Sequence, residues 1–206
     1  MELHEAMAQI SEIRQQLART ETFRGYRSAT VAGTGLVAFA AAGLQGLLLA
    51  EPMADVRAYL ALWIGAAVVA ATGTGLEMLL RSRRALDPMS ASLTRLAVEQ
   101  FLPCLIAGGM LTAVITLACP EGVPMLPGLW QILFSLGIFS SCRLLPRPTA
   151  WAAAFYLVCG VSSLAIARGP MALSPWAMGL PFGLGQCLWA AILYVTLERN
   201  HGRIAS

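Results

Sequence analysis

The chain has 206 residues, of which 57% are hydrophobic and only 12% are charged. Soluble globular proteins carry about 25% charged residues, so this composition excludes a soluble two-domain protein. It also excludes a disordered chain, a disulfide-stapled secreted scaffold and a free nucleic-acid-binding protein, and no nucleic-acid partner is expected. The class that remains is a polytopic membrane protein.

Long stretches without any charged residue recur along the chain. A helix needs about 20 apolar residues to cross a hydrocarbon core about 30 Å thick, and each stretch meets or nearly meets that length. The stretches lack the alternation of barrel strands and therefore predict helices. We predict an all-α integral membrane protein, a bundle of six transmembrane helices over approximately 28–50, 58–80, 100–119, 125–142, 149–167 and 176–197.

The basic residues, all 14 of them arginine, predict the orientation in the bilayer. Twelve lie before the first span, after the second, after the fourth or after the last, and only Arg57 and Arg168 lie in the opposite connections. By the positive-inside rule, both termini are expected in the cytoplasm, with residues 198–206 as a cytoplasmic tail and the cytoplasmic membrane as the location. The first stretch is too long for a cleavable signal peptide, so we expect a retained helix.

Residues 2–18 predict a cytoplasmic amphipathic helix, joined to the first span by a linker that ends at residue 27. The segment contains strong helix formers and neither Gly nor Pro. Its apolar face is expected to bind a protein partner or a second copy of the chain, or else to pack on the protein's own cytoplasmic loops. The apolar face consists of Leu3, Ala6, Ile10, Ile13 and Leu17.

A second cytoplasmic helix is predicted to start at Asp87 and Pro88, an N-cap followed by proline at the first helical position. It contains a helical i,i+4 pair of opposite charge, Arg95 and Glu99. Nothing interrupts it before the third span, where Pro103 should kink the helix and free the carbonyl of Glu99.

Small residues recur every four positions in the first two spans and predict close helix packing. The two ladders are Thr34, Ala38, Ala42 and Gly46, and Ala67, Ala71 and Gly75. Three tryptophans near the predicted outer boundary are interpreted as interfacial anchors or as core aromatics: Trp63, Trp130 and Trp176.

The spans contain almost no titratable groups and no catalytic, cofactor-binding or metal-binding motif, so we predict no enzyme, no cofactor and no metal site. Glu77 is the one carboxylate that falls within a predicted span. It is interpreted either as an interfacial pair with Arg81 or as a group with a proton- or cation-linked role. The five cysteines lack metal-binding spacing and are interpreted as small buried hydrophobes.

Polar amides and an unusual sixth span suggest a solute path. Glutamines in three spans either line a wet route or bond neighbouring helices together, and the second interpretation is favoured. The sixth span opens with GLPFGLGQ at 179–186, whose glycines and proline predict a bent or interrupted helix of the kind that transporters use. The candidate path consists of Gln45, Glu77, Gly183, Gly185 and Gln186.

Two functions follow from these observations. The first is a non-enzymatic membrane scaffold or regulatory subunit that lies in the lipid bilayer and engages a partner through residues 2–18. The alternative is a small channel or transporter for a neutral or weakly charged solute, in which the sixth span lines the route. A homo-oligomer is compatible with either, because small-residue faces favour helix association.

Overall fold

A computed structural model of the chain describes residues 28–85, 88–142, 145–166 and 169–198. Within these ranges the protein is all-helical, and six helices are long and apolar enough to cross a membrane. This confirms the all-α class and the six long apolar helices, which are compatible with a membrane-embedded protein. The long helices are α2 (Ser28–Leu48), α3 (Val56–Ala85), α4 (Pro88–Ala118), α5 (Leu126–Ser141), α6 (Thr149–Ile166) and α7 (Pro175–Leu193). The short elements are η1 (Pro120–Met125), η2 (Gly169–Leu173) and the π-helical turn η3 (Tyr194–Glu198).

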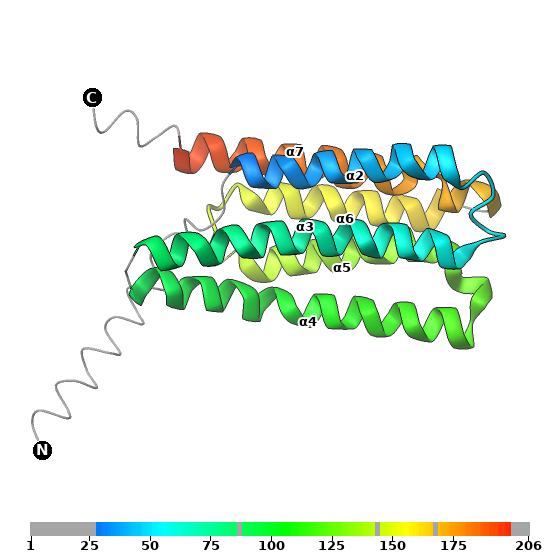
Figure 1. Cartoon of the computed structure of the whole chain (residues 1–206), viewed down its shortest axis with the longest axis horizontal. Helices are drawn as coiled ribbons and strands as arrows, with labels where there is room; N and C mark the ends of the chain where they lie inside the picture. The colour runs from blue at the N-terminus through cyan, green and yellow to red at the C-terminus, as the bar shows by residue number, and fades with distance from the viewer. Residues whose placement is uncertain (1–27, 86–87, 143–144, 167–168, 199–206) are drawn as a thin grey trace, which may run out of the picture.

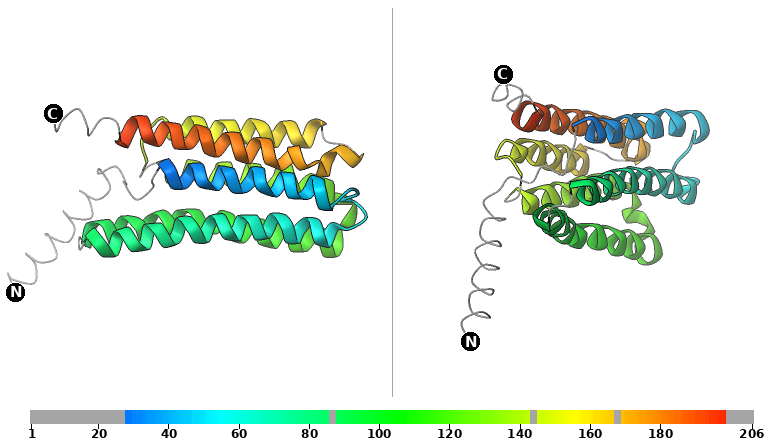
Figure 2. Two further views of the ribbon diagram at one scale, coloured as in Figure 1. Left: turned by 45° about the horizontal axis from the view of Figure 1, so that its top comes forward. Right: turned by 60° about the vertical axis from the view of Figure 1, so that its left-hand side comes forward.

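The helices run up and down and form a closed ring (Figure 1). Each packs against its neighbour in the sequence, and α2 packs against α7 to close the ring. We call the end where α2 begins and α7 ends the proximal end, and the end with η1 and η2 the distal end. The hairpin of α3 and α4 projects past the other helices at the proximal end, as Figure 1 and the left-hand view of Figure 2 show.

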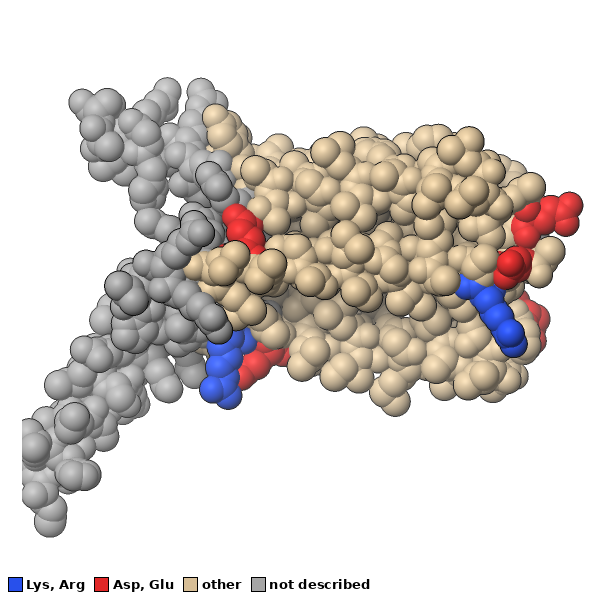
Figure 3. Space-filling model, in the orientation of Figure 1, with Lys and Arg blue, Asp and Glu red and all other residues tan. Residues whose placement is uncertain are grey.

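Charged side chains lie at the two ends of the bundle, and the face in view between them is free of charge (Figure 3). The six apolar helices span this uncharged band. A charged group is energetically costly at the centre of a bilayer, so an uncharged band is expected where helices cross a membrane. Length and composition therefore agree with a multi-pass helical arrangement.

Prolines lie inside two of the long helices without ending them. Helix α4 runs from Pro88 through Pro103 to Ala118, as the sequence predicts. Helix α7 contains Pro181 but remains helical from Pro175 to Leu193. Of the two predicted alternatives, a bent or an interrupted sixth span, the interruption is wrong. Gln131 of a neighbouring helix supplies the hydrogen bond that the proline removes.

The interior consists of two stacked cores. The proximal core includes Val31, Met78, Ile138, Tyr156 and Trp189 and is built from α2, α3, α5, α6 and α7. The distal core is built from α2, α3, η1, α5, η2 and α7, and Phe182 packs against both cores. The distal core consists of Ala41, Ala42, Tyr59, Trp63, Val123, Leu126, Leu173 and Met178.

One of the two predicted small-residue ladders lies at a helix interface. Ala38 and Ala42 of α2 are buried, and a methyl group added to Gly179 of α7 would come within 2.5 Å of the Ala42 side chain. On α3, by contrast, Ala67 and Ala71 are exposed. The prediction for the second ladder is wrong, because its spacing gives a smooth face but not a neighbouring helix to cover it.

A close backbone approach occurs at a pair of glycines outside these ladders, Gly128 on α5 and Gly160 on α6. A Cβ atom on either residue would lie 2.8 Å from the carbonyl oxygen of the other. Because the obstructing atom is backbone, it cannot move aside as a flexible side chain would. These two glycines allow α5 and α6 to pack at short distance.

Replacing Gly160 with alanine (Gly160→Ala) should therefore destabilise the bundle. Overpacking costs about 1–3 kcal/mol, and each kcal/mol shifts the melting temperature of a chain of this size by about 2–4 °C. The matched control is Gly73→Ala, since no atom lies within 4 Å of a Cβ there and alanine favours a helix by about 0.5–1 kcal/mol. Thermal unfolding in detergent should show a loss for the first variant and no loss for the second; equal effects would contradict the packing argument.

Candidate functional site

Gln131 on α5 bonds to a backbone carbonyl that Pro181 leaves free. A proline has no N–H, so the carbonyl four residues before it in a helix loses its usual donor. For Pro181 this carbonyl belongs to Ala177, and the Gln131 Nε2 group donates a hydrogen bond to it at 2.8 Å. The amide therefore supplies the missing donor from another helix and connects α5 to α7.

Gln45 on α2 has the same role at the entrance to α7. Its Nε2 group donates to the carbonyl of Leu173 at 2.7 Å, and its Oε1 atom accepts from the Trp63 indole N–H at 2.7 Å. Gln45 is fully buried and Trp63 is 4% exposed. Trp63 is therefore a core aromatic and not an interfacial anchor. The amide joins α2, α3 and the segment before α7.

Aromatic rings from neighbouring helices fill the space beside two glycines of α7. A Cβ on Gly183 would meet the Phe39 ring of α2 at 2.3 Å, and a Cβ on Gly185 would meet the Tyr156 ring of α6 at 2.5 Å. These glycines therefore provide space for side chains. The Cβ atom of Gln186 lies beside Gly35, 3.2 Å from a Cβ built on that glycine.

Aromatic side chains fill the space between α4, α5, α6 and α7. The ring of Phe134 makes edge contacts with Phe101, Tyr156 and Phe182, with centroids 5.3, 4.9 and 5.4 Å apart. Trp189 lies 6.5 Å from the same ring. Such pairs stabilise a core beyond the area that they bury. The middle of these four helices is therefore packed with rings.

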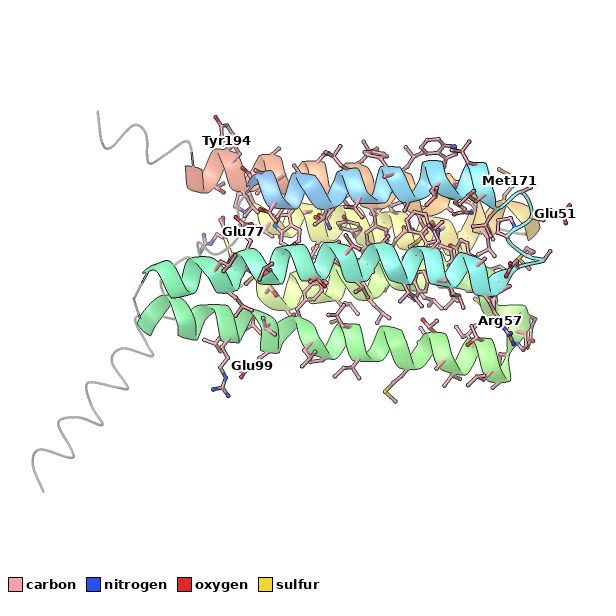
Figure 4. The ribbon with its side chains drawn as sticks, in the orientation of Figure 1. Glu51, Arg57, Glu77, Glu99, Met171 and Tyr194 are labelled. Carbon is pink, nitrogen blue, oxygen red and sulfur yellow. The ribbon has the colours of Figure 1, made fainter. Side chains whose placement is uncertain are left out.

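Glu77 on α3 accepts a hydrogen bond from the Thr30 hydroxyl of α2. Thr30 is the third residue of α2, so the carboxylate lies beside the first turn of that helix. The side chain of Arg81, the expected partner of Glu77, lies outside the described part of the structure. Figure 4 places Glu77 toward the proximal end.

Other predicted pairs and groups lie at the surface. Arg95 Nε donates to Glu99 Oε1 at 2.6 Å, and this hydrogen bond raises the pKa of Arg95, although the pair is exposed. Trp176 is exposed, whereas Trp130 donates to the Thr112 hydroxyl at 2.9 Å. The five cysteines are free, with Cys119 and Cys187 exposed and the others partly buried. The interpretation as buried hydrophobes is therefore wrong for Cys187 and holds only in part for Cys104, Cys142 and Cys159.

The candidate path residues are spread along the bundle. Gln45 lies near the distal end of α2, Glu77 near the proximal end of α3, and Gly183, Gly185 and Gln186 lie between on α7. The apolar face of residues 2–18 falls outside the described residues. Among the residues that the structure describes, no three His, Cys, Asp or Glu side chains come together as a metal site.

Sequence reasoning missed three residues that contact the predicted site residues. Thr30, Trp63 and Tyr156 were not identified as partners of Glu77, Gln45 and the α7 glycines. One signal was available: the position four residues before Pro181 identifies the free carbonyl, although nothing local identifies its donor. No protein-family model, curated protein or solved structure matches the chain.

The link between Gln131 and Pro181 can be tested with a double-mutant cycle. Gln131→Leu leaves the buried carbonyl of Ala177 without a donor and should lower the free energy of unfolding by about 1–3 kcal/mol. Pro181→Ala restores an N–H four residues on, so in that background Gln131→Leu should cost clearly less. Denaturant unfolding of the four proteins measures the coupling, and additive losses would contradict it.

The Thr30–Glu77 bond should stabilise the contact between α2 and α3. Hydrogen bonds to charged groups contribute about 1.5–3 kcal/mol, so Thr30→Val should lower the free energy of unfolding by that order. Thr74→Val on α3 is the matched control, because the Thr74 hydroxyl bonds only within its own helix, to Ala70. In a Glu77→Leu background the effect of Thr30→Val should shrink. An unchanged effect there would mean that Thr30 acts through something other than Glu77.

Proposed function

We propose that this protein is a non-enzymatic scaffold or regulatory subunit of the cytoplasmic membrane. In this proposal both termini lie in the cytoplasm, and a partner binds the apolar face of residues 2–18. The partner face consists of Leu3, Ala6, Ile10, Ile13 and Leu17. The bundle holds this segment at the membrane surface.

The main support for this proposal is that the side-chain amides of Gln45 and Gln131 form hydrogen bonds within the protein. A solute path needs polar groups that can exchange partners with the solute. Gln45 has both ends of its amide bonded to protein, and Gln131 uses its N–H group to replace a helical bond. Ser135 on α5 likewise donates to the Ala153 carbonyl of α6 at 2.7 Å. These bonds favour a fixed bundle, as a scaffold requires.

The shape of the proximal end also supports the proposal. The α3–α4 hairpin projects beyond the other helices at the end where α2 begins (Figure 1). Residues 1–27 directly precede α2 in the sequence, and α2 begins at that end. A partner held by residues 2–18 would therefore lie close to this projection, which offers a second surface for it.

The alternative is a small channel or transporter for a neutral or weakly charged solute. In favour of it, α7 contains Pro181 within a membrane-spanning helix, and prolines at such positions are compatible with movement of one half of a helix against the other. Against it, aromatic rings occupy the space beside Gly183 and Gly185. A scaffold therefore agrees better with the interior.

Changes on the predicted partner face should abolish binding without affecting the bundle. Replacing Ile10 and Ile13 with aspartate should remove the protein that co-purifies with the full chain, since two charges then lie on the apolar face. Replacing Gln9 and Gln16 on the polar face with aspartate is the matched control and should preserve co-purification. Both variants should retain the melting temperature.

The same preparations decide between the two functions. For the alternative, proteoliposomes should pass a neutral solute such as glycerol or urea, and removal of residues 1–20 should leave the flux intact. Partner loss with the Ile10 and Ile13 variant and no flux above protein-free liposomes would support the scaffold. Flux that survives the truncation, with no partner lost, would overturn it.

A further inference from the structure

Two buried polar atoms in the distal half of the bundle have no hydrogen-bond partner among the described residues. They are the Tyr59 hydroxyl of α3 and the Gln131 Oε1 atom of α5. Both side chains are 0% exposed. Leaving a buried polar group unpaired carries the full penalty of removing it from water, so native proteins rarely do so.

The orientation of the Gln131 amide is fixed by its other end. Its nitrogen donates to the Ala177 carbonyl, and a flipped amide would place two oxygen atoms against each other there. The Oε1 atom therefore needs a donor from elsewhere. The Tyr59 hydroxyl, in turn, needs an acceptor for its proton.

Both side chains border the distal core and lie close to the end of the bundle. Tyr59 belongs to that core, and Gln131 bonds to the residue that precedes Met178 of the same core. Helices α3 and α5 both begin at the distal end, and the two residues lie about 5 and 8 Å along them. Side chains on a helix tilt toward its N-terminus, here toward the distal surface.

Among the residues that the structure describes, no charged side chain at this end supplies a missing partner. Glu51, Asp55 and Arg57 are exposed, and Figure 4 shows Glu51 and Arg57 at the distal edge of the bundle. The carbonyls of Leu173 and Ala177 already accept from Gln45 and Gln131. The unpaired atoms are thus one hydroxyl and one amide oxygen in apolar surroundings.

We propose that the distal half of the bundle holds ordered internal water, as one molecule or more, which donates to Gln131 Oε1 and accepts from the Tyr59 hydroxyl. Water is both donor and acceptor, and buried water typically makes two to four hydrogen bonds to groups of this kind. A cation does not fit, because Ca²⁺ takes about six to eight oxygen ligands and the site offers two neutral ones. This site is independent of the partner face on residues 2–18.

The direction in which one substitution changes the melting temperature tests the proposal. If water pairs the hydroxyl, Tyr59→Phe removes a satisfied hydrogen bond and leaves the water short of a partner, so the melting temperature of the full chain in detergent should fall by about 2–4 °C. If the hydroxyl is unpaired, the same change removes a penalty and the melting temperature should stay constant or rise, which overturns the proposal. Tyr194→Phe is the matched control, because Tyr194 is 52% exposed and lies at the opposite, proximal end of the bundle (Figure 4).

A structure of the full chain at about 2 Å resolution provides the second measurement. The proposal requires a water peak within about 2.6–3.2 Å of the Tyr59 hydroxyl and of Gln131 Oε1, whether one molecule or a connected pair. The peak at Tyr59 should vanish or shift in the Tyr59→Phe variant. Clear side-chain density with no peak at either atom would overturn the proposal even if the substitution destabilised the protein.

Discussion

A backbone carbonyl that loses its helical donor inside a membrane needs another donor from the protein, because the surrounding lipid offers none. This constraint explains the position of the two glutamines that contact α7. Pro181 deprives the Ala177 carbonyl of its donor, and Gln131 of α5 supplies one. The Leu173 carbonyl, at the turn into α7, accepts from Gln45 of α2. Helix α7 can therefore contain a proline and remain continuous, at the cost of fixed contacts with two neighbours.

Those contacts require the helices to approach closely, which is why small residues recur on α7 and its neighbours. Gly179 packs on Ala42 of α2, and the gaps beside Gly183 and Gly185 receive the rings of Phe39 and Tyr156. Without a hydrophobic driving force between helices in lipid, association depends on such packing and on interhelical hydrogen bonds. The pairing of glycine with aromatic rings gives a large contact area at short interhelical distance. The GLPFGLGQ segment is thus a packing surface along its whole length.

Much of the fold was predictable from the sequence, because crossing a membrane is a local property of a segment. The absence of charge and the length of each apolar stretch gave the six helices within a few residues, and Pro88 marked the start of α4. Interhelical partners were not predictable, since they depend on which helices become neighbours. The α3 ladder of Ala67 and Ala71 has the same spacing as the buried α2 ladder but faces outward. The four-residue spacing identifies a helix face made of small residues. Whether another helix packs on that face depends on which helices become neighbours in the bundle.

Burial is uneven around the ring, and this bears on where a partner would act. The apolar windows of α3 and α4 are 11% and 6% buried, against 44% for those of α5 with η1 and of α7. Segments with few buried contacts open at a lower free energy than the core. The hairpin that projects farthest at the proximal end is therefore also the part of the bundle whose position is easiest to change. Two hydrogen bonds tie the hairpin to α2, from Thr30 to Glu77 toward the proximal end and from Trp63 to Gln45 toward the distal end. Both are made by residues of α3, whereas α4 is held to the ring through its contacts with α3, η1 and α5.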